Sequence, residues 1–138
     1  MTTIKAKKGE FVNLVNGLFQ VQDLKGKKFS LTVLKNIRTI EQELKDLENA
    51  GKPTEEFMEL AKQVNKIANE NSEDSESKIN ELEDKNKELV ASRKKQVEEV
   101  TKMMEEEITI KLNSISEKDL PNDITAKQLS NIEKIINN

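Results

Sequence analysis

The chain has 138 residues, of which 36% are charged and 34% hydrophobic, and its net charge is −3. It contains no His, Cys, Trp or Tyr, so it lacks the usual proton shuttle near neutral pH and most of the usual ligands for transition metals. This composition excludes disulfides, weighs against catalysis, and favours helices that pack through narrow apolar stripes.

The charge is unevenly distributed along the chain. Residues 1–35 carry seven lysines against Glu10 and Asp23, whereas residues 41–107 carry 20 acidic and 11 basic side chains. A basic head and an acidic middle predict either head-to-middle pairing between copies or an acidic partner for the head. The alternative is that these charges only solvate helix faces.

The first predicted element is a short helix over about residues 9–22. Gly17 lies inside it and weakens it relative to Ala. Residues 23–28 then form a turn, in which Gly26 can adopt a positive φ. The apolar residues of the helix recur at i, i+3, i+4, i+7 and i+8, which makes one face: Phe11, Leu14, Val15, Leu18 and Phe19.

A second helix is expected over residues 30–50, with Ser30 as its N-cap and Gly51 just after its end. Leu31 and Leu34 widen its apolar seam in the first turns. The seam itself follows the 4, 3, 4, 3 spacing of a heptad: Val33, Ile37, Ile40, Leu44 and Leu47.

Thr54 is the predicted N-cap of a third helix. The polar run 69–75 is either a loop or an exposed stretch of continuous helix, and we favour a break there. Residues 75–107 then form the longest predicted helix, in which Asn86 and Arg93 occupy seam positions. These polar residues either fix the register of a helical partner or mark an exposed seam. The third helix has its own apolar seam: Phe57, Leu60, Val64 and Ile67.

The pattern changes again from residue 108 onward. Residues 108–112 alternate and are β-branched, which predicts a strand, and its expected partner is the segment near residues 20–29. Thr125 and Gln128 form a capping box for a final short helix. The apolar face of that helix is Leu129, Ile132, Ile135 and Ile136.

Together these elements predict a mainly α fold. We expect a single domain, in which a long antiparallel helical hairpin (30–107) stands on a small α/β base formed by the two chain ends (1–29 and 108–138). The long helix then packs either on the helix at 30–50 or on another chain.

No motif indicates a catalytic, cofactor or metal site. The carboxylate run 105–107 is expected to be a solvated face, with weak Mg²⁺ or Ca²⁺ binding as the alternative. Two lysine groups (5, 7 and 8; 25, 27 and 28) can form one basic patch, but without arginine forks or aromatics they make nucleic acid an unlikely partner. The basic run Arg93, Lys94 and Lys95 is expected to pair with Glu98 and Glu99 along the helix.

Neither a signal peptide nor a membrane span is indicated, so we expect a soluble protein that does not bind membranes.

Three stretches resemble a family of small tailed-bacteriophage proteins of unknown function, encoded among virion-assembly genes. They are Phe29–Ile37 leading into Ile40–Leu44, the charged hairpin that follows, and the closing segments Ile108–Leu112 and Leu120–Ile132. The resemblance covers most of the chain and brings no catalytic residues. It implies a virion component or assembly helper, located in the virion or in the host cytoplasm during assembly.

The sequence thus predicts a non-enzymatic phage structural or assembly protein that packs its helices on other virion proteins and is a possible homo-oligomer. A regulatory or chaperone-like protein-binding module is the alternative, and a nucleic-acid-associated protein is less favoured. The expected partner-binding residues combine an apolar face with flanking lysines: Phe11, Leu14, Val15, Leu18, Phe19, Phe29, Lys25, Lys27 and Lys28. For Phe19 and Phe29 a place in the chain's own core is the favoured alternative, because large apolar side chains are usually buried.

Overall fold

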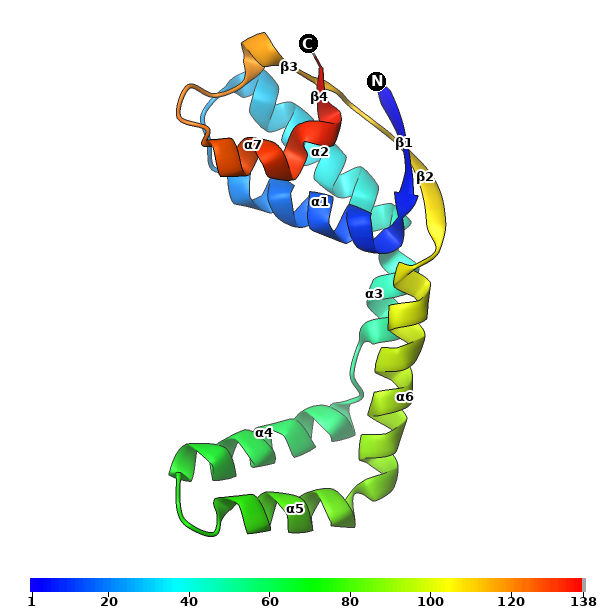
Figure 1. The fold of residues 1–138 in the computed structure, drawn as a ribbon, viewed down its shortest axis with the longest axis vertical. Coiled ribbons are helices and arrows are strands. Elements are labelled where there is room, and N and C mark those ends of the chain that lie inside the picture. The colour runs from blue at the N-terminus through cyan, green and yellow to red at the C-terminus, as the bar shows by residue number, and fades with distance from the viewer. Residues whose placement is uncertain (138) are drawn as a thin grey trace. The chain divides into compact units, whose positions relative to one another are not determined.

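The computed structural model describes residues 1–137 and is mainly α-helical, with small sheets formed by the chain ends (Figure 1). The chain divides into two compact units. Unit 1 comprises residues 1–47 and 102–138, and unit 2 comprises residues 48–101. The expected base therefore also contains the helix that begins near residue 30, which the sequence analysis had assigned to the hairpin.

Unit 1 holds a two-stranded antiparallel sheet, in which β1 (Thr2–Lys7) pairs with β2 (Glu107–Leu112). Strand β2 confirms the strand predicted at 108–112. Its predicted partner near residues 20–29 is wrong, because that segment joins two helices instead. The N-terminus alternates as a strand should, with Ile4 and Ala6 turned inward and Lys5 and Lys7 exposed.

Helices α1 (Lys8–Val21) and α2 (Lys27–Glu43) follow β1. Gly26 joins them with φ 142°, a left-handed conformation that favours glycine. Ser30 is not the N-cap of α2, because the helix begins three residues earlier; its hydroxyl donates instead to the Leu24 carbonyl at 3.3 Å. A turn at Leu44 separates α2 from α3 (Lys45–Gly51).

The predicted heptad seam of α2 and α3 is confirmed as core. Its five members are all buried, although the helix they lie on is interrupted at Leu44. Helix α2, which carries the first three of them, packs against α1 and β2. The seam consists of Val33, Ile37, Ile40, Leu44 and Leu47.

The C-terminal segment completes unit 1. The capping box of α7 (Ala126–Ile132) is confirmed, since Thr125 Oγ1 accepts the Gln128 amide and Gln128 Oε1 accepts the Thr125 amide. Two short 3₁₀ turns, η1 (Glu117–Asp119) and η2 (Glu133–Ile135), flank it. Strands β3 (Ile115–Ser116) and β4 (Ile136–Asn137), which the sequence analysis missed, pair in parallel.

Helix α7 approaches α1 closely at Gly17. A β-carbon at this position would lie 2.9 Å from both the Cβ atom and the carbonyl oxygen of Asn131. Only glycine allows the two backbones to come this near without a shift. The residue that weakens α1 on its own is thus required by the packing of unit 1.

Unit 2 contains α4 (Glu55–Glu70), α5 (Ser75–Lys85) and most of α6 (Lys87–Met104). Thr54 caps α4 as predicted, with its hydroxyl accepting the Phe57 amide at 3.2 Å. The predicted break is also confirmed, because Asn71 adopts a left-handed conformation with φ 47°. Residues 75–107 do not form one helix, however: the path bends at Asn86 (Figure 1), and α6 ends at Met104.

The two units differ sharply in how much apolar surface they bury. Of the 18 buried apolar side chains among the described residues, 17 belong to unit 1 and only Leu60 belongs to unit 2. Five other apolar side chains of α4 and α5 are only half-buried, and we call them the unit 2 seam: Phe57, Val64, Ile67, Ile79 and Leu82. Unit 2 is therefore a helical unit with little core of its own.

Candidate functional site

The apolar face predicted to bind a partner is part of the core of unit 1. Phe11, Leu14, Val15, Leu18 and Phe29 are all buried, with exposed fractions between 0% and 7%. The prediction that Phe11, Leu14, Val15 and Leu18 form a docking surface is therefore wrong, whereas the core role favoured for Phe29 is confirmed. Helix α1 packs against α2, α7 and β1, so its apolar face is covered by the chain itself.

The remaining predicted partner-binding residues are exposed. Phe19, at the end of α1, is 38% exposed, and Lys25, Lys27 and Lys28 lie on the surface at the turn before α2 and in its first residues. Lys28 Nζ lies 3.9 Å from an Asp119 carboxylate oxygen, an exposed pair that adds little stability. These four residues remain available to a partner.

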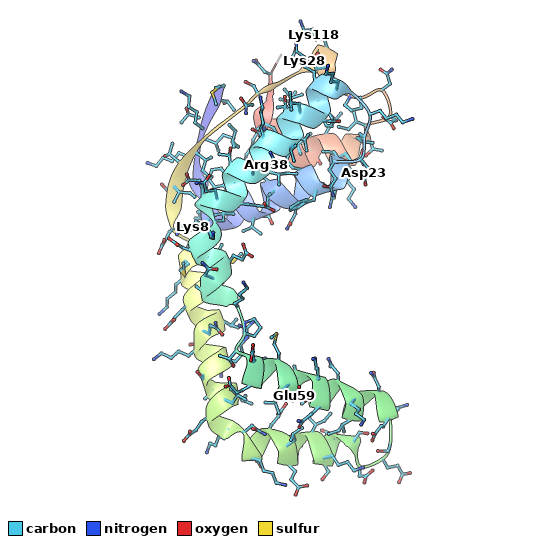
Figure 2. The ribbon with its side chains drawn as sticks, turned by 180° about the vertical axis from the view of Figure 1, so that it is seen from behind. Lys8, Asp23, Lys28, Arg38, Glu59 and Lys118 are labelled. Atoms are coloured by element: carbon cyan, nitrogen blue, oxygen red, sulfur yellow. The ribbon has the colours of Figure 1, made fainter. Side chains whose placement is uncertain are left out.

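The most distinctive exposed surface is the side of α2 that faces away from the core. Leu31 and Leu34 are 50% and 43% exposed there, although the sequence analysis counted them as an extension of the seam. Lys27, Lys35 and Arg38 recur on the same side at helical spacing. We call these five residues the α2 outer face; Figure 2 shows Arg38 midway along this helix and Lys28 near its start.

The α2 outer face is basic as well as apolar. Residues 24–40 contain five cationic side chains and no acidic one. Among residues 1–137, no carboxylate lies within 4.0 Å of Lys27, Lys35 or Arg38. Two exposed leucines between unpaired cations fit an acidic partner that also offers apolar surface.

The other lysine group is used internally. Lys7 Nζ donates to Glu105 at 2.7 Å and Lys8 Nζ donates to Glu106 at 2.8 Å, while Lys5 lies 3.7 Å from Glu107. The carboxylate run 105–107 is therefore paired with the N-terminal strand and helix start. The expected single basic patch does not form, since half of its lysines are neutralised by these contacts.

Folding shifts the pKa values of Lys7 and Glu10, near the start of α1, in the direction that favours their charged forms. The hydrogen bond and charge of Glu105 raise the pKa of Lys7 above its usual 10.5. The pKa of Glu10 lies below its usual 4.5, first because its carboxylate accepts the Lys7 amide at 2.9 Å, and then because Lys134 lies nearby. Both shifts favour the charged forms and mark structural contacts on exposed groups.

In unit 2, Arg93 and Gln96 of α6 hold the end of α3. Arg93 Nη1 donates to the Gly51 carbonyl, and Gln96 Nε2 donates to the carbonyls of Ala50 and Lys52 at 2.7–2.8 Å. The guanidinium also lies over the Phe57 ring, 5.6 Å from its centre. The predicted pairing of Arg93 with Glu98 and Glu99 is therefore wrong, because its guanidinium donates instead to a backbone carbonyl at the end of α3.

Unit 2 also carries a shallow apolar groove between α4 and the α5–α6 bend, with a volume of about 200 Å³. Phe57, Ala61 and Val64 supply its α4 side, and Val90 and Glu83 supply the other side. Small-molecule sites usually span about 300–1,000 Å³. The groove is thus better suited to side chains inserted by another protein; we call it the α4–α5 groove.

Chemistry-bearing groups do not converge within the described residues. Among residues 1–137, no three acidic side chains are placed to hold a metal ion, and every buried side-chain nitrogen or oxygen has a hydrogen-bond partner. Over the same range, no helix has both the length and the apolar character needed to cross a membrane. The candidate site is therefore a pair of surfaces, the α2 outer face and the α4–α5 groove.

Comparison of the chain with protein-family models, with characterised proteins and with solved structures gave no significant match.

Proposed function

We propose that this chain is a non-enzymatic structural or assembly protein of a tailed bacteriophage that acts by packing its helices against other virion proteins. The observation that carries the proposal is the difference in apolar burial between the two units. Unit 2, all of whose residues the structure describes, buries only one apolar side chain. Its apolar seam is left half-covered by the rest of the unit.

A half-covered seam favours association. Each Å² of apolar surface removed from water contributes roughly 25 cal/mol, so covering several half-exposed side chains yields a few kcal/mol. Phe57, Val64, Ile67, Ile79 and Leu82 are all candidates for such covering. A helical partner with a complementary stripe provides it without any change in the secondary structure of unit 2.

The non-enzymatic part of the proposal is supported by composition, since the chain has neither His nor Cys. The phage context is supported by the resemblance of the three sequence stretches described above. In that context the chain acts in the virion or in the host cytoplasm during assembly, and unit 2 contacts its partner there.

The proposal is tested by quantifying the chain in purified particles and in purified assembly intermediates of the phage that encodes it. We expect a fixed ratio to a major virion protein in at least one of the two. Absence from intermediates and particles alike would refute a structural or assembly role.

A pair of variants links this result to the seam. Val64→Glu with Ile67→Glu places charge in the half-buried seam, whereas Gln63→Glu with Lys66→Glu adds acidic side chains on the exposed side of the same helix. We expect the seam variant to be lost from the particle and the surface variant to be retained. Circular dichroism confirms that both remain helical.

A further inference from the structure

Two separate surfaces of this chain complement each other. The α2 outer face presents two exposed leucines one turn apart, flanked by cations. The α4–α5 groove presents an apolar floor on an acidic unit, since unit 2 carries 14 acidic and nine basic side chains. One surface projects apolar groups and the other receives them.

The groove is shaped for a helix. Ala61 and Asn65 are short side chains on its α4 side, so the backbone of a docked helix can approach α4 closely. Phe57 and Val64 provide an apolar floor, and the volume of about 200 Å³ suits inserted aliphatic side chains. Leucines at positions i and i+3 of a helix are the usual anchors for this mode of docking.

The charges match in sign. Glu83 lines the groove, and Glu76 lies two turns before it on the same side of α5. Among the described residues, neither carboxylate lies within 4.0 Å of a cationic side chain. Lys27, Lys35 and Arg38 are the unpaired cations of the α2 outer face. Their attraction to an acidic rim fixes the orientation of the docked helix and excludes basic partners.

We propose that the α2 outer face of one copy docks into the α4–α5 groove of a second copy of this chain, with Leu31 and Leu34 as anchors. This inference rests on the proposed function of helix packing and names the partner. Because the two surfaces differ, two copies either exchange the contact reciprocally in a closed two-fold dimer or repeat it head-to-tail in a ring or a filament.

Two variants test the contact by mixing. The face variant, Leu31→Glu with Leu34→Glu, disables only the α2 outer face; the groove variant, Ala61→Arg with Glu83→Lys, disables only the groove. Analytical ultracentrifugation over about 5–500 μM spans the affinities expected of a modest helix contact. We expect the wild type to form a closed dimer or a series of oligomers, and each variant alone to associate at least tenfold more weakly.

The mixture is the decisive sample. The groove of the face variant and the α2 outer face of the groove variant are both intact, so the mixture should form a one-to-one dimer and nothing larger. Val97→Glu and Glu81→Lys add charge of the same sign on other exposed positions of unit 2 and should assemble like the wild type. Raised salt should weaken assembly, because it screens the rim charges.

Cross-linking of the wild type gives an independent readout. A zero-length carbodiimide reagent applied to mixed light and ¹⁵N-labelled chains should join Lys27 or Lys35 of one copy to Glu76 or Glu83 of another. The inference is overturned by a wild type that stays monomeric, by a variant that assembles like the wild type, by a mixture that stays monomeric, or by oligomers cross-linked elsewhere. A monomeric chain that is still present in particles at a fixed ratio would overturn this contact alone and leave the proposed function standing.

Discussion

The side chain of Asn36 hydrogen-bonds both backbone groups of Asn113, as a neighbouring β-strand would. Its Nδ2 donates to the Asn113 carbonyl at 2.8 Å, and its Oδ1 accepts the Asn113 amide at 2.8 Å. Asn36 is fully buried on α2, where it satisfies the backbone just after β2 ends. This contact fastens the core helix of unit 1 to the end of its sheet.

Replacing Asn36 by Ala should lower the free energy of unfolding of unit 1 by about 2 kcal/mol, because two backbone groups lose their partners. Asn113→Ala is the matched control. It keeps both 2.8 Å bonds, which use backbone atoms, and removes only a 3.5 Å side-chain contact, so its effect should stay below about 0.5 kcal/mol. Urea unfolding measures both; equal effects would contradict the assignment.

Gly17→Ala should destabilise unit 1 by about 1–3 kcal/mol, even though Ala favours a helix over Gly by up to about 1 kcal/mol. The added methyl group would meet Asn131 at 2.9 Å. Gly51→Ala is the control, because its methyl group would lie 3.6 Å from Val100, an ordinary contact. Thermal unfolding should show a lower midpoint for the first variant only; a stabilised Gly17→Ala protein would disprove the close approach.

Glu10 should titrate below its usual pKa of 4.5 when followed by NMR of its side-chain carboxyl carbon. A carboxylate whose pKa is lowered by folding stabilises the folded state above that usual value, and this contribution is lost as the pH falls through the lowered value. In Lys134→Ala the pKa should rise only partly, since the Lys7 amide is the larger cause. A full return to 4.5 would show that the ion pair dominates.

Asn86→Ala should straighten the bend between α5 and α6. The Asn86 side chain donates to the Leu82 carbonyl at 2.9 Å, and such a bond competes with regular helix geometry. Spin labels at Ser77 and Ser92 should therefore move apart, as measured by pulsed electron resonance. Asn80→Ala, on the exposed side of α5, should leave the distance unchanged.

Local patterns predicted most of the secondary structure. The heptad seam of α2 and α3, the Thr54 and Thr125 caps and the positive φ of Gly26 all depend on near neighbours, so the sequence displays them directly. The β1–β2 pairing joins residues about a hundred positions apart. Register over that distance is set by packing, which explains why the partner of β2 was misplaced.

The candidate site was harder to predict for a similar reason. An apolar face has the same pattern whether it is covered by the chain itself or by a partner, so the face of Phe11 and Leu18 was assigned to a partner although it is core. Leu31 and Leu34 differ from that face, because they lie outside the 4, 3, 4, 3 spacing of the seam and have cationic side chains beside them. This position indicates exposure. That departure from the seam was the sequence clue to the α2 outer face.

The central claim is that unit 2 completes its core by packing on another protein. Hydrogen exchange of the α4 and α5 amides tests this directly, first in the isolated chain at low concentration and then in the assembled form. We expect fast exchange in the isolated chain, protection at least tenfold greater after assembly, and little change in α1. Amides of α4 and α5 that are already as protected as those of α1 in the isolated chain, and unaffected by assembly, would contradict the account.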